Sequence, residues 1–297
     1  MEIKMNILTY DIEEWYVEKV FHGNHKEKYA EYDECLDKIL AKLDETHTKG
    51  TFFCVGGMAR EFPDVLKRIA SNGHEIGCHS DRHTWLNKMS REEVEEDTHK
   101  AIDSLRQCTG QDVVSYRAPA FSVGKSNPWA FEILYKNGIR CDSSVFPAER
   151  DFGGFPDYGM AVPSIVSYNG CKMKEFPICM TNIIGKNVVY SGGGYFRIFP
   201  YFFLKNTMKR ADYAISYFHI NDLLKDKLAL ATKSEYEEYF KEEASTTINR
   251  LMRYFKSNIG KKGALDKMNK LVDTMKFVNI AYADAVIDWN KVPVVEL

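Results

Sequence analysis

The chain has 297 residues, 44% of them hydrophobic, so it can bury a substantial core, and no stretch reads as a flexible hinge between two halves. Its 40 basic and 42 acidic residues are well mixed and leave a formal charge of -2, which gives no electrostatic footprint for nucleic acid or an anionic membrane. We therefore expect one large domain with neither of these as a partner.

The start of the chain and its cysteines indicate the compartment. The N-terminus enters a strand-like run almost at once, and acidic residues from Asp11 onward leave no apolar segment long enough for export or for a membrane span. Seven scattered cysteines, never in a C-x-x-C pair, lie mostly in or beside apolar runs. This pattern predicts a cytoplasmic protein with buried free thiols and no membrane insertion.

Short β-rich runs alternate with amphipathic helical runs over the first half of the chain, which is the pattern of parallel strands joined by crossover helices. Apolar periodicity, prolines at helix starts, glycines after helix ends and a capping box of Ser90 and Glu93 mark the boundaries. The expected strands are 5–10, 51–55, 75–78, 113–116 and 139–141, and the expected helices are 33–46, 63–73, 90–110 and 127–138.

The alternation of β-rich and helical runs does not continue into the second half of the chain. Residues 145–211 are rich in Gly, Pro and aromatics, and we expect an irregular insertion of the kind that forms lids or groove walls. A strand at 213–218 resumes the core, followed by a C-terminal helical extension over about 225–275 and a strand-like run at 277–280. We therefore expect a single catalytic domain over residues 1–297 with α/β architecture.

His79 and His83 are candidate metal ligands. They lie four residues apart after the strand 75–78, a spacing that would bring both imidazoles onto one side of a helical turn. Two surface histidines also reach this spacing by chance, but Asp11 and Glu13 end the first strand, and two histidines with a carboxylate form a recurring hydrolytic metal site.

Polar residues recur wherever a predicted strand ends. In an α/β barrel the loops after the strands share one face, so residues far apart in sequence can converge there. The residues at these ends are Asp11, Glu13, His79, His83, Arg117, Asp142 and His219.

Five short motifs in this order resemble those of the NodB-homology polysaccharide deacetylases, over roughly residues 6–224. The matching segments are T-Y-D-I-E-E-W at 9–15, H-S-x-x-H at 79–83, R-x-P at 117–119, D-x-S at 142–144 and Y-F-H at 217–219. The segment G-G-G-Y-F-R-I-F-P at 192–200 also resembles a branch associated with bacterial exopolysaccharide loci. The resemblance implies a distorted (β/α) barrel.

The resemblance also implies roles for the site residues. Asp11 is the implied catalytic base, and His79 and His83 are implied metal ligands. Many family members carry two adjacent aspartates where this chain has Asp11 and Glu13. Residues two apart in a strand face the same side, which favours Glu13 as the third ligand, although a bend at the strand end would favour Glu14 instead.

The remaining roles each have a structural alternative. We expect His219 to protonate the departing amine, although it could be a core histidine. Arg117 would hold Asp11 or form a purely structural ion pair, and Asp142 would orient His219 or cap its strand. A backbone N–H near Ala120 is the oxyanion donor that the resemblance implies. The aromatic rings of Tyr195 and Phe196 would stack on a sugar or pack in the core.

These residues predict a metal-dependent amidohydrolase that removes acetyl groups from an N-acetylated sugar of a polysaccharide or its precursor. Zinc is the expected ion, although cobalt, nickel or iron suit the same ligands. One alternative is an amidohydrolase that acts on a small non-sugar amide, and another is a catalytically idle glycan-binding relative. Residence in the cytoplasm would favour a nucleotide-linked or lipid-linked sugar as substrate.

Overall fold

A mostly parallel sheet forms the centre of the protein. The computed structural model describes residues 4–150, 153–240 and 245–297. Within these residues the sheet has nine strands in the order β10-β1-β2-β3-β4-β5-β7-β6-β11, and β6 with β7 is its antiparallel pair. The strands are β1 Met5–Ile12, β2 Thr51–Cys54, β3 Glu75–Cys78, β4 Ser115–Tyr116, β5 Cys141–Asp142, β6 Ser164–Tyr168, β7 Cys171–Glu175, β10 Tyr213–His219 and β11 Val294–Glu296.

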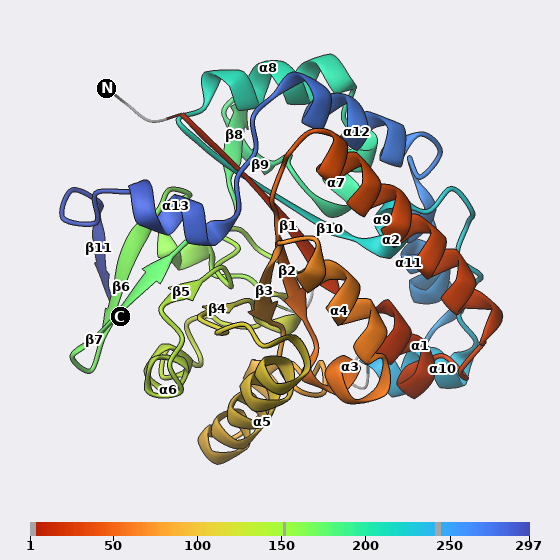
Figure 1. Ribbon diagram of the computed structural model, residues 1–297, viewed down its shortest axis with the longest axis horizontal. Helices are drawn as coiled ribbons and strands as arrows, with labels where there is room; N and C mark the ends of the chain where they lie inside the picture. Colours follow the sequence, from red (N-terminus) through yellow and green to blue (C-terminus); the bar gives the residue numbers. More distant parts are fainter. Residues whose placement is uncertain (1–3, 151–152, 241–244) are drawn as a thin grey trace.

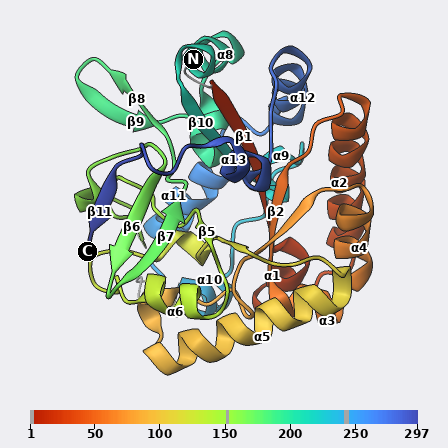
Figure 2. The same cartoon turned by 60° about the vertical axis from the view of Figure 1, so that its left-hand side comes forward.

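Helices surround this sheet, so the fold is of the α/β class (Figure 1). Figure 1 shows α2, α4 and α5 around β1 to β3, and α8 beside α12 at the opposite end. A separate hairpin of β8 Met180–Ile183 and β9 Lys186–Val189 projects from the body in Figure 2. The helices are α1 Glu14–Phe21, α2 Glu27–Glu45, α3 Gly56–Glu61, α4 Pro63–Ser71, α5 Arg91–Thr109, α6 Ala130–Lys136, α7 Gly193–Ile198, α8 Tyr201–Arg210, α9 Ile220–Leu223, α10 Lys233–Phe240, α11 Thr247–Asn258, α12 Ala264–Thr274 and α13 Ile280–Val286.

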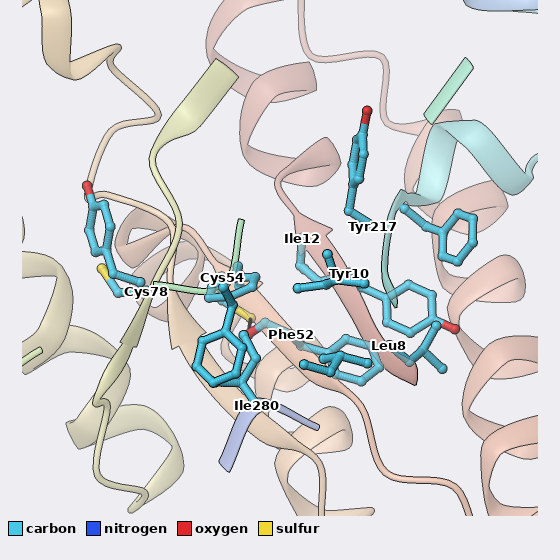
Figure 3. Packing of buried hydrophobic residues seen from close by; sticks show 14 of the residues in the cluster. Leu8, Tyr10, Ile12, Phe52, Cys54, Cys78, Tyr217 and Ile280 are labelled. Carbon is cyan, nitrogen blue, oxygen red and sulfur yellow. Dashed lines mark hydrogen bonds between the residues drawn. The ribbon is translucent and has the colours of Figure 1, made fainter. Parts of the chain in front are cut away.

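Strand β1 is the central element of the core. It pairs in parallel with β10 on one side, from Met5↔Tyr213 to Asp11↔His219, and with β2 on the other. Nearly all of its residues are buried, as expected for a parallel strand covered on both faces. Figure 3 shows its side chains packed against those of the neighbouring strands, with Tyr10 stacked on Phe52 at 4.7 Å between ring centroids.

The sheet is curled as the distorted-barrel class requires. In a flat sheet the ends of β1 and β4, three strand spacings apart, would be separated by about 14 Å, with side chains standing perpendicular to the sheet. Arg117, which follows β4, nevertheless donates to Asp11 of β1 at 2.8 Å, so the strand ends bend toward one another. The outer strands β10 and β11 are not paired with each other within the described ranges, so the barrel is open there.

Most of the predicted elements in the first half of the chain are present. The capping box of Ser90 and Glu93 begins α5, and Gly110 ends it in the left-handed conformation. The short helices α1 and α3 were not predicted. The expected strand at 277–280 is reduced to a single bridge between Val278 and Ile7, because α13 begins at Ile280.

The segment 145–211 contains more regular structure than predicted. Strands β6 to β9 and helices α7 and α8 lie within it, and β7 extends the central sheet next to β5. Its high content of glycine reflects tight turns, such as Gly170 and Gly185 with positive φ between paired strands. The predicted C-terminal helical extension is present as α10, α11 and α12.

The cysteines agree with the prediction of buried free thiols. All seven cysteines are free, and five of them are buried. No helix of the described chain combines the length and the apolar character needed to cross a lipid bilayer.

Candidate active site

Five of the predicted residues meet where the parallel strands end. Asp11 and Glu13 come from the end of β1, His79 and His83 from the loop after β3, and His219 from the end of β10. The parallel register places Asp11 beside His219, so these two side chains are neighbours by strand pairing.

Glu13, His79 and His83 form a compact group with the composition of a metal site. One ligand atom from each lies within 4.8 Å of the others. Glu13 Oε2 is 3.2 Å from His79 Nε2 and 2.6 Å from His83 Nε2. The histidines do not share a helical turn as predicted, because residues 79–83 form a loop in which His83 has a φ of 57°. Their rings still converge, with centroids 5.3 Å apart.

The donor atoms of this group suit a divalent cation. The Nδ1 atom of His79 lies 2.7 Å from the Arg117 carbonyl, and donation of its proton there would leave the Nε2 lone pair facing the site. Burial opposes ionisation of Glu13, but His83 and His219 outweigh it and hold the pKa of Glu13 well below its usual range. An ionised carboxylate and a neutral imidazole with an oriented lone pair are the groups that zinc binds.

Glu14 lies outside this group. Its carboxylate accepts a hydrogen bond at 2.8 Å from the backbone N–H of Asn221, at the start of α9. Burial, with the charge of Glu13 second, raises the pKa of Glu14 to about 8. The structure therefore places Glu13 beside the histidines and Glu14 beside α9.

Arg117 forms an ion pair with Asp11. Its Nη1 atom donates to Asp11 Oδ1 and to Thr9 Oγ1, both at 2.8 Å, and both members of the ion pair are buried. Its Nη2 and Nε atoms donate to Ser143 Oγ at 2.8 Å and to the Ser143 carbonyl at 3.2 Å. The ring of Phe53 lies 4.3 Å from the guanidinium carbon. These contacts fix the guanidinium and, through it, the carboxylate of Asp11.

His219 lies across from these carboxylates, and its partner differs from the predicted one. Its Nε2 is 3.8 Å from Asp11 and 3.7 Å from Glu13, while its Nδ1 is 3.1 Å from Asp222 Oδ2. Burial alone would lower the pKa of His219, but Glu13 and Asp222 outweigh it and raise the pKa to about 10. The carboxylate that orients His219 is therefore Asp222, which Arg197 also contacts.

Asp142 is engaged elsewhere, so its predicted contact with His219 is wrong. Its two carboxylate oxygens accept from the backbone N–H and the hydroxyl of Ser144, at 2.9 and 2.8 Å. Ser144 Oγ in turn accepts from the backbone N–H of Ala118 at 2.8 Å. Asp142 thus braces, through Ser144, the loop that carries Arg117, because both of its oxygens are occupied by Ser144.

The backbone at Ala120 has an unusual conformation. Ala120 lies in a short 3₁₀ turn, Pro119–Phe121, with φ of 54° and ψ of 17°. A non-glycine residue rarely adopts this region, and such residues concentrate at functional sites. The oxyanion role of its N–H stays a prediction.

The two aromatic residues predicted for a sugar groove have different environments. Phe196 is only 1% exposed, and its ring packs edge-on against Phe218 at 4.7 Å, so it belongs to the core and its groove role is wrong. The reason is that α7 is a helix, which sends adjacent side chains to different faces. Tyr195 is 43% exposed. It stays the candidate for contact with a sugar.

Tyr239 of α10 also reaches the site, which the sequence reasoning missed. Its ring stacks on His83 with centroids 6.3 Å apart and on His22 at 5.7 Å. No motif marks Tyr239, because it lies about 150 residues after His83 in a charged helix. Asp222 had a local signal, since its side chain and His219 form a capping box at the start of α9.

The mostly parallel α/β fold thus brings together, at the ends of its strands, a carboxylate with two histidines and a buried Asp–Arg pair. The family model for polysaccharide deacetylases matches residues 5–140, so this part of the chain is similar to that family. A second model, for a domain of unknown function (DUF3473), matches residues 143–284.

Curated relatives match part of this chain. The peptidoglycan-N-acetylglucosamine deacetylase of Bacillus cereus is 35% identical over 100 residues, 33% of this chain and 36% of that protein. The chitooligosaccharide deacetylase of Rhizobium leguminosarum bv. trifolii is 34% identical over 103 residues, 35% of this chain and 45% of that protein. The chain thus spans less than half the length of these relatives.

The fold as a whole has a solved counterpart. A crystal structure described as a polysaccharide deacetylase from Mycobacterium smegmatis superposes with a TM-score of 0.66 at 15% identity, over 100% of this chain and 94% of that one. At this identity the likeness shows the fold alone.

Proposed function

We propose that this protein is a metal-dependent N-deacetylase that hydrolyses the acetamide of an N-acetylated sugar and releases acetate. The observation that carries the proposal is the placement of Asp11. This carboxylate is fixed by Arg117 on one side and faces His219 at 3.8 Å on the other, beside the group of Glu13, His79 and His83. A base, an acid and a metal site on one face are the parts that amide hydrolysis needs.

The cation would be held by Glu13 and the Nε2 atoms of His79 and His83, and zinc is the ion that we expect. When bound, it would supply polarisation of the acetamide carbonyl and a lowered pKa for the attacking water.

The residues of the chain carry the proton transfers. Asp11 accepts a proton from the attacking water, whose oxygen forms the new bond to the acetyl carbon. The C–N bond then breaks, and His219 delivers a proton to the departing sugar nitrogen, so that acetate and a free amine are the products. Positioned proton transfers of this kind typically contribute ~10²–10⁴-fold each. The backbone N–H of Ala120 is the proposed donor to the oxyanion.

We propose a bacterial exopolysaccharide or its precursor as the source of the N-acetylated sugar. The support is the segment 192–200 together with the names of the relatives, which act on peptidoglycan and chitooligosaccharide. A cytoplasmic location, which we keep as part of the proposal, would favour a lipid-linked or nucleotide-linked precursor. Tyr195, an exposed residue of this segment, is the proposed contact for a sugar ring.

The test combines acetate release with metal analysis. We expect purified protein, stripped with a chelator and reloaded with zinc or cobalt, to release acetate from N-acetylglucosamine oligomers. Asp11→Asn should keep the bound metal and lose activity by ~10²-fold or more. Glu13→Ala should lose the metal, and the matched variant Glu14→Gln should keep it. Full activity in Asp11→Asn would overturn the hydrolase proposal, and metal loss in Glu14→Gln alone would overturn the ligand assignment.

A further inference from the structure

Helix α11 turns an apolar side toward solvent. Ile248 and Phe255 are 69% and 66% exposed, and Leu251, Met252 and Ile259 are exposed as well. These residues recur at intervals of three and four, so they form one continuous ridge along the helix. We name these five residues the α11 stripe.

The polar side of the same helix faces the protein. Arg250 donates to the carbonyl of Ala231 at 3.2 Å, and the buried amide of Asn258 exchanges hydrogen bonds with the backbone of Leu228 at 2.7 and 3.1 Å. The guanidinium of Arg253 lies 4.7 Å from the ring of Phe240. A surface helix normally buries its apolar side, so this orientation is reversed, and polar contacts fix it. An ordered apolar ridge in water marks a surface that meets a partner.

The chain segment that carries the stripe has charges of one sign. Residues 245–263 contain five basic residues and no acidic residue, although the whole chain has a formal charge of -2. Lys256 is exposed on the flank of the stripe, and Lys262 is exposed shortly after the helix. The partner must therefore accept bulky apolar side chains next to positive charge.

We propose that the α11 stripe binds the surface of an anionic lipid bilayer, with the helix lying in the plane of the interface. Interfacial helices combine a ridge of large apolar residues with flanking Lys and Arg. Anionic headgroups attract such cations at about 1 kcal/mol for each residue near the surface. A second copy of the chain is a poorer partner, because it would bring Lys256 and its neighbours against cations of the same sign.

Docking in this way would bring the bilayer close to the candidate active site. Arg253 of α11 contacts Phe240, the rings of Phe240 and Tyr239 are 4.8 Å apart, and Tyr239 stacks on His83. A substrate held at the membrane surface would thus be presented near the site. The binding itself does not depend on the proposed function, because it needs neither a metal nor turnover.

Flotation with lipid vesicles tests the proposal. We expect the full chain to float with vesicles of phosphatidylcholine and phosphatidylglycerol, to float less with phosphatidylcholine alone, and to be released as the salt concentration rises. Failure of the wild-type chain to float with the anionic vesicles would overturn the proposal.

Variants identify the surface. Replacement of both Leu251 and Phe255 by Asn should weaken binding by about tenfold or more, because their apolar area leaves the interface. Lys256→Ala should weaken binding to anionic vesicles by about fivefold. The matched control is Ile184→Asn, which changes a residue that is 98% exposed in the β8–β9 turn, where a φ of 50° also suits Asn. This control should float like the wild type.

Two further results would contradict the proposal. The first is unchanged flotation of the double variant of Leu251 and Phe255, with its fold verified by circular dichroism. The second is self-association of the wild type in sedimentation that this double variant abolishes, since the stripe would then be an interface between copies. Acetate release from soluble oligomers should be the same in all these variants, which separates this test from that of the proposed function.

Discussion

Arg117 shows why the chemistry of single residues matters in this site. Its guanidinium donates to Asp11, Thr9 and two acceptors of Ser143 at once. A lysine ammonium has three donors on a flexible stem and cannot match this planar arrangement. The arginine therefore fixes the position of the proposed base.

Asp222 is the residue whose change should reveal the role of His219. Burial opposes the charge of Asp222, but His219 outweighs it and lowers the pKa of Asp222, and the resulting carboxylate raises the pKa of His219. In Asp222→Asn the pKa of His219 should fall, so the acid form is lost at a lower pH. We expect kcat for acetate release to fall by roughly tenfold and the alkaline limb of its pH profile to move to lower pH.

Asp142→Asn is the control for this prediction. It should destabilise the fold through the loss of the brace on Ser144 but leave the alkaline limb in place. If Asp142→Asn shifts the alkaline limb of the pH profile and Asp222→Asn does not, the carboxylate that orients His219 is not Asp222.

The sequence predicted those site residues that depend on strand ends. Asp11 lies at the end of β1, Glu13 and His79 directly follow β1 and β3, and His83 lies in the loop after β3, so the parallel pairing of β1, β2 and β3 brings these segments together. The partner of His219 could not be chosen in this way, because both Asp142 and Asp222 follow a strand and only the direction of the side chain separates them. Tyr239 depends on packing between distant elements, and periodicity carries no information about that.

Strands β5 and β7 place two carboxyl groups opposite each other. Asp142 and Glu175 are partners in the parallel register, and both are buried. Burial, followed by the charge of Asp142, raises the pKa of Glu175 well above its usual range, and burial also raises the pKa of Asp142. The folded chain therefore holds a proton here that the unfolded chain releases.

This proton gives stability a specific dependence on pH. Because the pKa of Glu175 is raised on folding, its contribution is complete below the ordinary pKa and is lost as the pH rises toward the folded value. Urea unfolding of the wild type and Glu175→Gln should therefore diverge as the pH rises above about 5, in favour of the variant, by up to about 1.4 kcal/mol per pH unit. The exposed control Glu237→Gln should parallel the wild type. Parallel curves for Glu175→Gln would contradict the prediction.

Helix α10 should influence the metal site through Tyr239. Its ring covers His83 at an interplanar angle of 25° and restricts the orientation of that imidazole. We expect Tyr239→Ala to weaken zinc or cobalt affinity by roughly tenfold, as loss of a residue that supports a ligand does. Tyr239→Phe keeps the ring and should bind like the wild type in a metal titration. Equal loss in both variants would assign the effect to the hydroxyl instead.

Elements with caps and regular periodicity were predictable, whereas others depended on tertiary contacts. Helix α5 has a capping box and a closing glycine, and both ends were located. Strand β7 was missed because C-K-M-K-E alternates only weakly and gains its place by pairing with β5 and β6.

The whole molecule joins the two matched segments in one sheet. Strand β10, from the segment matched by the second model, pairs with β1 along seven residues. A chain of residues 1–142 would expose this edge of β1 and its apolar side chains. We expect this fragment to show no cooperative thermal transition by circular dichroism, whereas the full chain shows one. A sharp transition in the fragment would mean that the first segment folds independently.

For the whole molecule, the alternation of expected strands and helices in the sequence was enough to predict the α/β fold class. The net charge was less informative, because it averages over the surface and hides the single-sign segment at α11. The apolar side of α11 faces water because Arg250 and Asn258 form hydrogen bonds toward the protein. This orientation is visible only in the structure.

The contact of Arg117 with Asp11 across the curled sheet links the geometry of the candidate site to the curvature of the sheet. Phe53, Phe121 and Tyr217 lie 4.3, 5.7 and 6.0 Å from its guanidinium carbon and fill the space between the opposed strand ends. Because these rings pack between the strand ends, they set the width of the barrel opening at this edge of the sheet. We expect that trimming one of them would alter the gap between Asp11 and His219 without changing either residue, so that buried rings help to set the geometry of the candidate site.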